Sequence, residues 1–261
     1  MSGIDETDPL LLASQLCSRL CQDMLSPVGA LTNGLELLAD EKDPQMRQRC
    51  FELLEQSART SAAKLKYFRL AYGAAGGFGE QVSIDEPKAV IETLAADAKR
   101  VELNWAIEAA SVSKSAAKVM LNLAHIGLDA LVRGGTLDIG VEERDDVTEI
   151  VVRATGPKIA FDPTIGDALG GRLDPAELSG RTAPAHLLSL IAERSGGQIQ
   201  THAEGDALLL GATLVGTIMA LMGIGALLSP IHTLAEALNA QPDDGKSLPQ
   251  VGDVIANLYA G

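Results

Sequence analysis

The chain contains few aromatic residues, few cations and few cysteines. Phe, Trp and Tyr together make up 3% of its 261 residues, which disfavours the stacking platforms that bind bases or sugars. Lys and Arg number 21 against 35 Asp and Glu, and the net charge of −14 disfavours nucleic acid as a partner, because phosphate contacts need a surplus of cations. Three cysteines are too few, and odd in number, for a disulfide framework. Hydrophobic residues make up 46% of the chain, so we expect a sizeable folded core.

The two ends of the sequence bear on localisation. The acidic N-terminus lacks the basic and then apolar layout of a secretory signal peptide. Residues 207–235 contain no Asp, Glu, Lys or Arg, so one interpretation is that this segment spans a membrane. If 207–213 form a strand, only about fifteen apolar residues precede Pro230, fewer than the roughly twenty that a span needs. We therefore expect a cytoplasmic protein whose tail, 215–261, packs against the fold or binds a partner, with a membrane span as the alternative.

Residues 8–73 predict two helices in an antiparallel hairpin. Asp8 and Pro9 form an N-cap followed by a proline at the first helical position, and a polar segment over 40–44 separates the helices. Each helix carries an apolar stripe with a spacing of three or four residues. The stripes comprise Leu16, Leu20, Met24, Val28, Leu31, Leu35 and Leu38 in the first helix, and Met46, Cys50, Leu53, Leu54, Ala58, Leu65 and Phe68 in the second. One hairpin cannot cover both stripes, so they pack against the rest of the chain or against a second copy. The heptad-like spacing favours a homodimer with a four-helix bundle.

The segment 80–214, beyond a glycine-rich stretch over 74–79, mixes helical and extended patterns. It predicts helices over 86–99, 114–133 and 184–194, and strands over 81–84, 101–107, 136–142, 148–154, 198–202 and 207–213. Residues 155–180 are rich in Gly, Pro and Asp and predict a long loop. The expected fold class is therefore α+β, with a helical hairpin followed by a sandwich of helices against one mixed sheet.

Motifs of metal and nucleotide chemistry are missing from the sequence. The four histidines are far apart, and none has the spacing of a zinc site. Cys17 and Cys21 are one helical turn apart, but no second Cys or His pair accompanies them. No Walker A, GxGxxG or GxSxG motif stands in a suitable context. The sequence therefore predicts no metal site.

The most informative stretch is Leu20–Gly29, with the sequence LCQDMLSPVG. A proline inside a helix costs about 3 kcal/mol and removes the hydrogen bond to the carbonyl four residues back, so Pro27 predicts a deliberate local bend. Opposite the apolar stripe runs a face of polar and small residues where a partner can approach closely. It comprises Gln15, Arg19, Gln22, Ser26, Gly29 and Ala30.

This stretch resembles the dimerisation and phosphoacceptor hairpin of sensor histidine kinases, which carries His-Asp/Glu-x-x-x-Pro at the same spacing. The pattern Leu-Cys-x-Asp-x-x-Ser-Pro-x-x-Ala, followed by Gly-Leu-Glu-Leu-Leu, is similar to that of the ChpT-type histidine phosphotransferases of alphaproteobacteria. The acceptor histidine of that family falls on Gln22. The resemblance covers about residues 10–214.

The second segment resembles the ATP-binding domain of histidine kinases with its ligand residues replaced. The helix around 119–130 is similar to the one that supplies a magnesium-binding Asn, whose position is Ile126 here. In the stretch that matches the adenine-binding Asp-x-Gly-x-Gly loop, Ala154 replaces the Asp and Lys158 the second Gly. Residues 186–200 resemble the helix, Gly-Gly and strand that end such domains. The resemblance thus implies a degenerate kinase-type, ATPase-like sandwich over 80–214 that binds no ATP, which disfavours an ATP-using kinase.

The resemblance also implies a role in a bacterial two-component phosphorelay. In the family, the histidine takes a phosphoryl group from the receiver-domain Asp of a hybrid histidine kinase and passes it to the Asp of a response regulator, which supplies Mg²⁺. The implied catalytic positions are Gln22 and Asp23. The residues implied to shape the docking face for receiver domains are Arg19, Ser26, Pro27 and Ala30.

Gln22 leaves two interpretations open. The amide nitrogen of glutamine is delocalised into its carbonyl, so it neither attacks phosphorus nor titrates. Gln22 is then a replacement in a true phosphotransferase, or the chain is a pseudo-phosphotransferase, a scaffold that binds or sequesters a response regulator without relaying phosphate. His125, His186 and His202 lie in the second segment, outside the hairpin, so none of them is expected to replace the acceptor.

Overall fold

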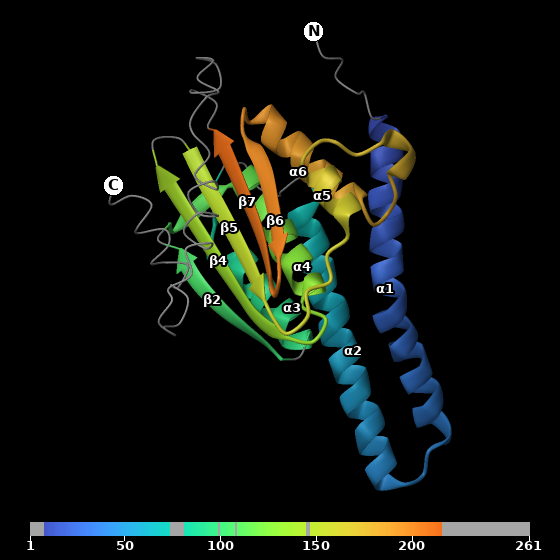
Figure 1. Cartoon of the computed structure of the whole chain (residues 1–261). Helices are drawn as coiled ribbons and strands as arrows, with labels where there is room; N and C mark the ends of the chain where they lie inside the picture. Colours follow the sequence, from blue (N-terminus) through green and yellow to red (C-terminus); the bar gives the residue numbers. More distant parts are fainter. Residues whose placement is uncertain (1–7, 74–80, 99, 108, 145–146, 216–261) are drawn as a thin grey trace.

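The computed structural model describes residues 8–73, 81–98, 100–107, 109–144 and 147–215, which form a helical hairpin beside an α+β part (Figure 1). The predicted α+β fold class is confirmed. The helices are α1 (Pro9–Asp40), α2 (Pro44–Ala71), α3 (Asp85–Asp97), α4 (Lys114–Ala130), α5 (Pro163–Leu169) and α6 (Ala183–Arg194), with a short 3-10 turn, η1 (Pro175–Glu177). The strands are β1 (Gln81–Ser83), β2 (Val101–Ile107), β3 (Ser111–Ser113), β4 (Gly135–Arg144), β5 (Val147–Thr155), β6 (Gln198–Glu204) and β7 (Ala207–Val215).

Capping residues set the ends of the hairpin helices. The carboxylate of Asp8 accepts a hydrogen bond from the backbone N–H of Leu10 at 2.9 Å, and Asp43 accepts one from Gln45 at 3.1 Å. A proline follows each cap, where its missing N–H leaves no helical bond unmade. At the turn, Arg47 donates to the carbonyls of residues 38 and 41 at 3.1 and 2.9 Å and so satisfies the open end of α1. The predicted hairpin is confirmed, and α1 continues as one helix through Pro27.

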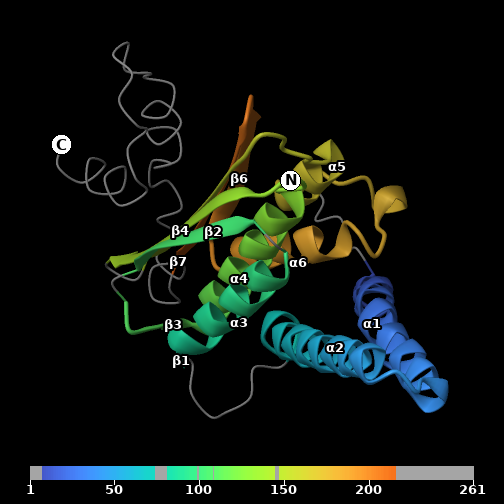
Figure 2. The same ribbon diagram turned by 90° about the horizontal axis from the view of Figure 1, so that it is seen from below.

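A five-stranded sheet, in the order β2-β4-β5-β7-β6, forms the α+β part. β2 runs parallel to β4 and the other neighbours are antiparallel. Helices α3, α4 and α6 cover one face of this sheet (Figure 2). The core lies between α4 and the strands, where fully buried side chains of both layers meet. They include Met120, Leu121 and Leu123 from α4, and Leu137, Ile139, Ile150, Val152, Leu208 and Leu210 from the strands.

Each predicted helix and strand is present, with ends shifted by no more than three residues. The long loop predicted over 155–180 is wrong, because α5 and η1 form within it. Asp162 and Asp174 cap these two elements and each precedes a proline, the same signal that begins both hairpin helices. Neither element is long enough to show an apolar period, so the sequence pattern does not predict them. The short strand β3, which pairs with β1, was also missed.

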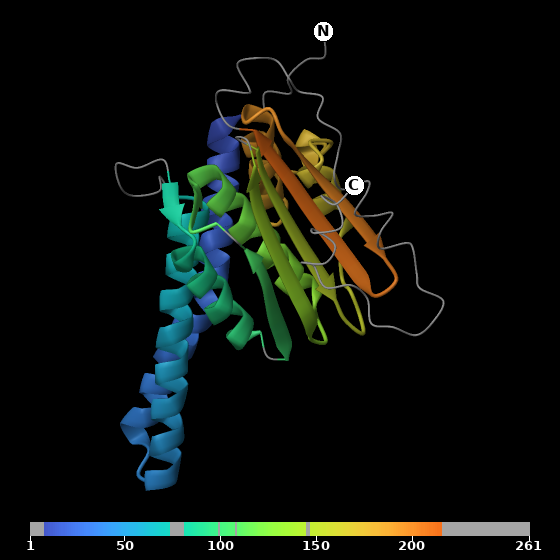
Figure 3. The same ribbon diagram turned by 90° about the vertical axis from the view of Figure 1, so that its left-hand side faces the viewer.

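The hairpin packs on the α+β part along half of its length. Tyr67, Phe68 and Ala71 of α2 are buried in the common core, and so is Leu12 of α1. The loop before α6 passes close to α1, since a Cβ at Gly180 would lie 3.5 Å from backbone atoms of α1. The other half of the hairpin, with the turn between α1 and α2, extends past the sheet (Figures 1 and 3).

The projecting half of the hairpin exposes apolar side chains. Val28 and Leu35 belong to the predicted stripe of α1 and are 46% and 59% exposed, whereas Leu16, Leu20 and Met24 of the same stripe pack on the core. The chain therefore leaves part of the second half of that stripe exposed, although Leu31 and Leu38 are half-buried. The other exposed apolar residues of the hairpin are Leu10, Leu11, Leu25, Leu37, Met46, Phe51, Leu53 and Leu65.

The glycine-rich stretch 74–79 lies outside the described residues. So does the tail after Val215, which was expected to pack against the fold or bind a partner, with a membrane span as the alternative. Within the described ranges, no helix combines the length and the apolar character that crossing a membrane requires.

Candidate functional site

α1 presents position 22 to solvent. Gln22 and Ser26, one helical turn apart, are both exposed, and the neighbouring Leu25 is 70% exposed. Pro27 is buried, and Ala30 is half-buried. The turn that contains Gln22 thus has one open face, with the proline directed away from it.

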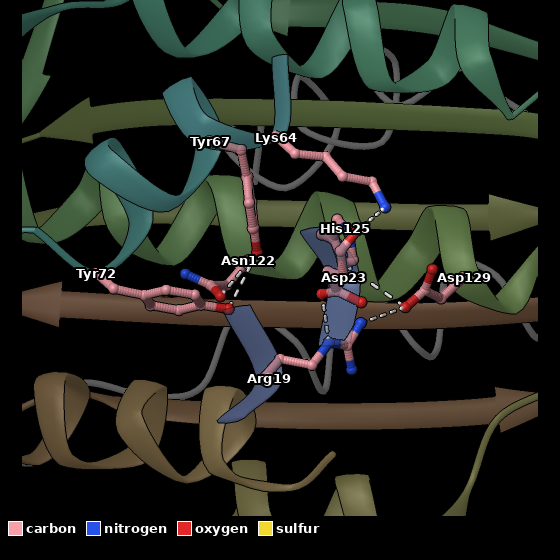
Figure 4. A network of polar contacts seen from close by, with 8 residues as sticks. All are labelled: Arg19, Asp23, Lys64, Tyr67, Tyr72, Asn122, His125 and Asp129. Atoms are coloured by element: carbon pink, nitrogen blue, oxygen red, sulfur yellow. Dashed lines mark hydrogen bonds and ion pairs between the residues drawn. The ribbon is translucent and has the colours of Figure 1, made fainter. Parts of the chain in front are cut away.

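Asp23 and Arg19 lie beside Gln22 on α1, but both are half-buried, where α1 meets α4. Arg19 Nε donates to Asp23 Oδ2 at 2.6 Å, and Arg19 Nη2 lies 3.6 Å from Asp129 Oδ2 on α4 (Figure 4). His125 Nδ1 lies 3.5 Å from the same oxygen of Asp129. Arg19, predicted for the docking face, is therefore engaged by two carboxylates of its own chain, and its side chain is 21% exposed.

The second hairpin helix joins this network from the other side. The ring of Tyr67 stacks on that of His125 at 4.8 Å, and its hydroxyl donates to Asn122 Oδ1 at 3.0 Å. Asn122 in turn donates to the carbonyl of Lys118 at 2.9 Å. Burial raises the pKa of Tyr67 well above its usual value of 10, so the hydroxyl remains a donor. α1, α2 and α4 are thus held together by polar contacts directly beneath the turn of Gln22.

Lys64 of α2 completes the arrangement. Its Nζ donates to the backbone carbonyl of Asp23 at 2.8 Å. Asp23 is consequently held twice, at its side chain by Arg19 and at its main chain by Lys64 (Figure 4).

Comparison with known proteins decides the family. The chain is 31% identical over 205 residues to the protein phosphotransferase ChpT of Brucella abortus (strain 2308), a match that covers 77% of this chain and 94% of that protein. The chain belongs to the ChpT family of phosphotransferases. Residues 84–207 match the family model of the histidine phosphotransferase C-terminal domain.

A solved structure agrees with this assignment. The structure of a bacterial phosphotransferase superposes with a TM-score of 0.69 at 30% identity, and the match covers 78% of this chain and 97% of that one. The histidine kinase AdeS of Acinetobacter baumannii matches more weakly, with a TM-score of 0.41 at 12% identity over 73% of this chain and 95% of that one. The predicted resemblance to ChpT-type proteins is confirmed.

In this ChpT-family chain a cavity of about 240 Å³ lies between α1, α4 and the segment before α6. Ile126, at the position where kinases carry a magnesium-binding Asn, lines the cavity with an apolar side chain. Ala154, at the position of the adenine-binding Asp, is fully buried. Arg181, which also lines the cavity, is paired with Asp162 at 3.0 Å. The residues at the two kinase ligand positions therefore do not fit magnesium or adenine, since neither side chain offers a polar atom.

His125 gives the network a pH dependence. Burial lowers its pKa below 6.5, and Lys64 and Arg19 act in the same direction, against the carboxylates of Asp129 and Asp23. Between pH 6.5 and the lower pKa of folded His125, the unfolded chain binds a proton that the folded chain does not. Acidification through this range therefore favours unfolding.

We expect the free energy of unfolding in urea to fall between pH 7.5 and 5.5, with His125 contributing at most about 1.4 kcal/mol per pH unit. The His125→Gln variant is expected to lose this contribution. His202→Gln is the matched control, because His202 is 47% exposed and contacts only Glu204 among the charged groups of the described chain. An unchanged slope in His125→Gln would contradict the assignment.

The sequence predicted the helix that carries one side of this network, but not the residues that α2 and α4 add to it. It placed Gln22, Asp23, Arg19, Ser26, Pro27 and Ala30 correctly on one stretch of helix. It missed Lys64, Tyr67, Asn122 and Asp129, whose roles depend on how α2 and α4 lie against α1. The sequence did contain one signal for Lys64. Pro27 has no N–H, so the carbonyl of Asp23 needs a hydrogen-bond donor from outside the helix.

Proposed function

We propose that this ChpT-family protein acts in a two-component phosphorelay and docks receiver domains on the exposed face of α1 around Gln22. The observation that carries the proposal is the turn itself. Gln22 and Ser26 on this turn are exposed, and Arg19 and Lys64 hold Asp23 at its side chain and main chain. The side chain at position 22 has no nucleophilic nitrogen that could accept a phosphoryl group. The partners are receiver domains of a hybrid histidine kinase and of response regulators.

Gln22 determines whether a docked receiver can transfer its phosphoryl group. A histidine at this position would offer a nitrogen lone pair near neutral pH, whereas a glutamine amide offers none. Glutamine keeps a polar side chain at the centre of the docking face, so complex formation is compatible with its presence. We therefore propose that the chain with Gln22 binds receivers without carrying the phosphoryl group. Relay through this chain is the second candidate, and it requires histidine at position 22.

Docking is tested by calorimetric titration of the chain with receiver domains of hybrid kinases and response regulators from its own organism. The Ser26→Arg variant places a long side chain one turn from Gln22 and is expected to weaken binding by about tenfold or more. Gln45→Arg, at the far end of the hairpin, is the matched control and should leave affinity unchanged. The proposed function fails if no receiver binds the unchanged chain, or if both variants bind equally well.

We propose further that the chain is a homodimer. The exposed apolar residues of the projecting half, among them Val28 and Leu35 of α1 and Phe51 of α2, would be covered by the same face of a second hairpin. Large contiguous apolar surface is uncommon on monomers. A four-helix bundle is the simplest closed arrangement of two such hairpins.

We also propose that no nucleotide binds in the cavity that Ile126 lines, and that any magnesium ion in the relay is supplied by the receiver. Titration with Mg-ATP is expected to show no saturation up to millimolar concentration, because Ile126 and Ala154 provide neither a metal ligand nor an adenine acceptor. Saturable binding in the micromolar range would contradict this prediction and reopen an ATP-dependent role.

A further inference from the structure

We propose that Lys64 is a positioning residue, which supplies the hydrogen bond that Pro27 removes from α1 and thereby fixes the turn of Gln22 for docking. The inference rests on the proposed function and concerns how that same face is held. It is carried by the 2.8 Å contact between Lys64 Nζ and the carbonyl oxygen of Asp23.

The need for such a donor follows from helix geometry. In an α-helix, the N–H of residue 27 would donate to the carbonyl of residue 23. Pro27 has no N–H, and its ring also pushes that carbonyl away from the helix axis. α1 nevertheless continues through Pro27, and the contact is partly buried, so an unpaired carbonyl at Asp23 would be costly.

Lys64 meets this need from outside the helix. It lies on α2, 41 residues along the chain, and its half-buried side chain crosses the interior of the hairpin to reach Asp23 (Figure 4). Its neighbour Lys66 is exposed. The difference shows that the contact is specific to one position and does not come from a general excess of lysine on α2.

The position of the acceptor makes the contact relevant to function. Asp23 follows Gln22 directly, so the direction in which side chain 22 points depends on the backbone that Lys64 holds. The side chain of Asp23 is fixed independently by Arg19 at 2.6 Å. Removal of Lys64 should therefore loosen the main chain of this turn while the ion pair keeps it attached to the α+β part.

A double-mutant cycle tests the link between Lys64 and Pro27. In Lys64→Met the donor is lost and the apolar stem is kept, whereas Pro27→Ala returns an N–H that can reach the carbonyl of Asp23. We expect exchange of the amides of residues 24–26 and 28 to accelerate by about fivefold to tenfold in Lys64→Met. In the Pro27→Ala background the same substitution should change exchange less than about twofold. Equal effects in the two backgrounds would overturn the proposal.

Receiver binding supplies the functional measurement. Lys64→Met is expected to weaken docking by about fivefold to tenfold, Lys64→Arg to retain most of it, and the matched control Lys66→Met to leave it unchanged. Equal affinities of the Lys64→Met and Lys66→Met variants, with circular dichroism showing both folded, would also overturn the proposal. The exchange cycle needs no receiver, so its outcome is decisive even if no receiver binds and the proposed function fails.

Discussion

The Gln22→His variant is expected to take up a phosphoryl group from a phosphorylated receiver domain, whereas the chain with Gln22 takes up none. The imidazole nitrogen would attack phosphorus, a P–N bond would form, the P–O bond to the receiver Asp would break, and the carboxylate would leave with the electron pair. Loss of a nucleophile costs many orders of magnitude in rate, so the difference should exceed about a thousandfold. Transfer of radiolabel, lost on acid treatment, is the measurement.

Gln22→Asn is the matched control for this prediction. It keeps an uncharged amide, whose nitrogen lone pair is delocalised into the carbonyl, so it should remain unlabelled. Receiver affinity should change little in Gln22→His, because the docking face is otherwise intact. If the histidine variant binds receivers and still takes up no label, the turn is a docking surface alone. If the Gln22 chain itself becomes labelled, our interpretation of the site is wrong.

A chain that carries both Val28→Asp and Leu35→Asp is expected to be monomeric at concentrations where the unchanged chain is a dimer. Both side chains lie on the exposed apolar face of α1. Assembly would bury four unpaired carboxylates per dimer, and at about 1 kcal/mol or more for each, the dissociation constant should rise at least about a thousandfold. Analytical ultracentrifugation over a dilution series measures the change.

Asn33→Asp provides the matched control for dimerisation. Asn33 is exposed on the same helix, but at 100° per residue it points away from both Val28 and Leu35. It adds charge to α1 without entering the apolar face, and the dimer should persist. A monomeric unchanged chain, or a double variant that still dimerises with the same affinity, would contradict the prediction and leave the apolar face to another partner.

Local signals in the sequence predicted the hairpin well. The caps at Asp8 and Asp43, each followed by a proline, and the apolar period of α1 depend only on residues close together in the chain. Strand β5 was predicted for the same reason, because its residues alternate between buried and half-buried along the strand. A helix shorter than two turns, such as α5, is too short to show a repeat of apolar residues. Its sequence signal is then the N-cap residue Asp162.

The polar network could not be predicted in the same way. Arg19 and Asp23 are one turn apart, so their ion pair was within reach of sequence reasoning. Its continuation to Asp129 depends on where α4 lies, far along the chain. The direction of Arg19 was therefore predicted as outward, toward a partner, although in the folded chain it faces α4. Whether a receiver also contacts this residue stays a prediction.

Helix α4 of the α+β part contacts the hairpin through polar side chains. Asn122, His125 and Asp129 of α4 contact side chains of the hairpin. Ile126 and Ala154 contribute packing to the core. This architecture thus anchors the hairpin in one orientation, which is the property that a docking surface on α1 requires.

Because α1 is long, a small rotation of the helix about Arg19 becomes a large displacement at its far end. The helix continues for 32 residues without interruption, and its far end at Asp40 lies roughly 30 Å from Arg19 at 1.5 Å per residue. A tilt of about 10° around Arg19 would therefore swing that end by roughly 5 Å, as on a lever. A small change in the contacts of Arg19 with Asp23 and Asp129 would therefore displace the projecting half of the hairpin by several ångströms.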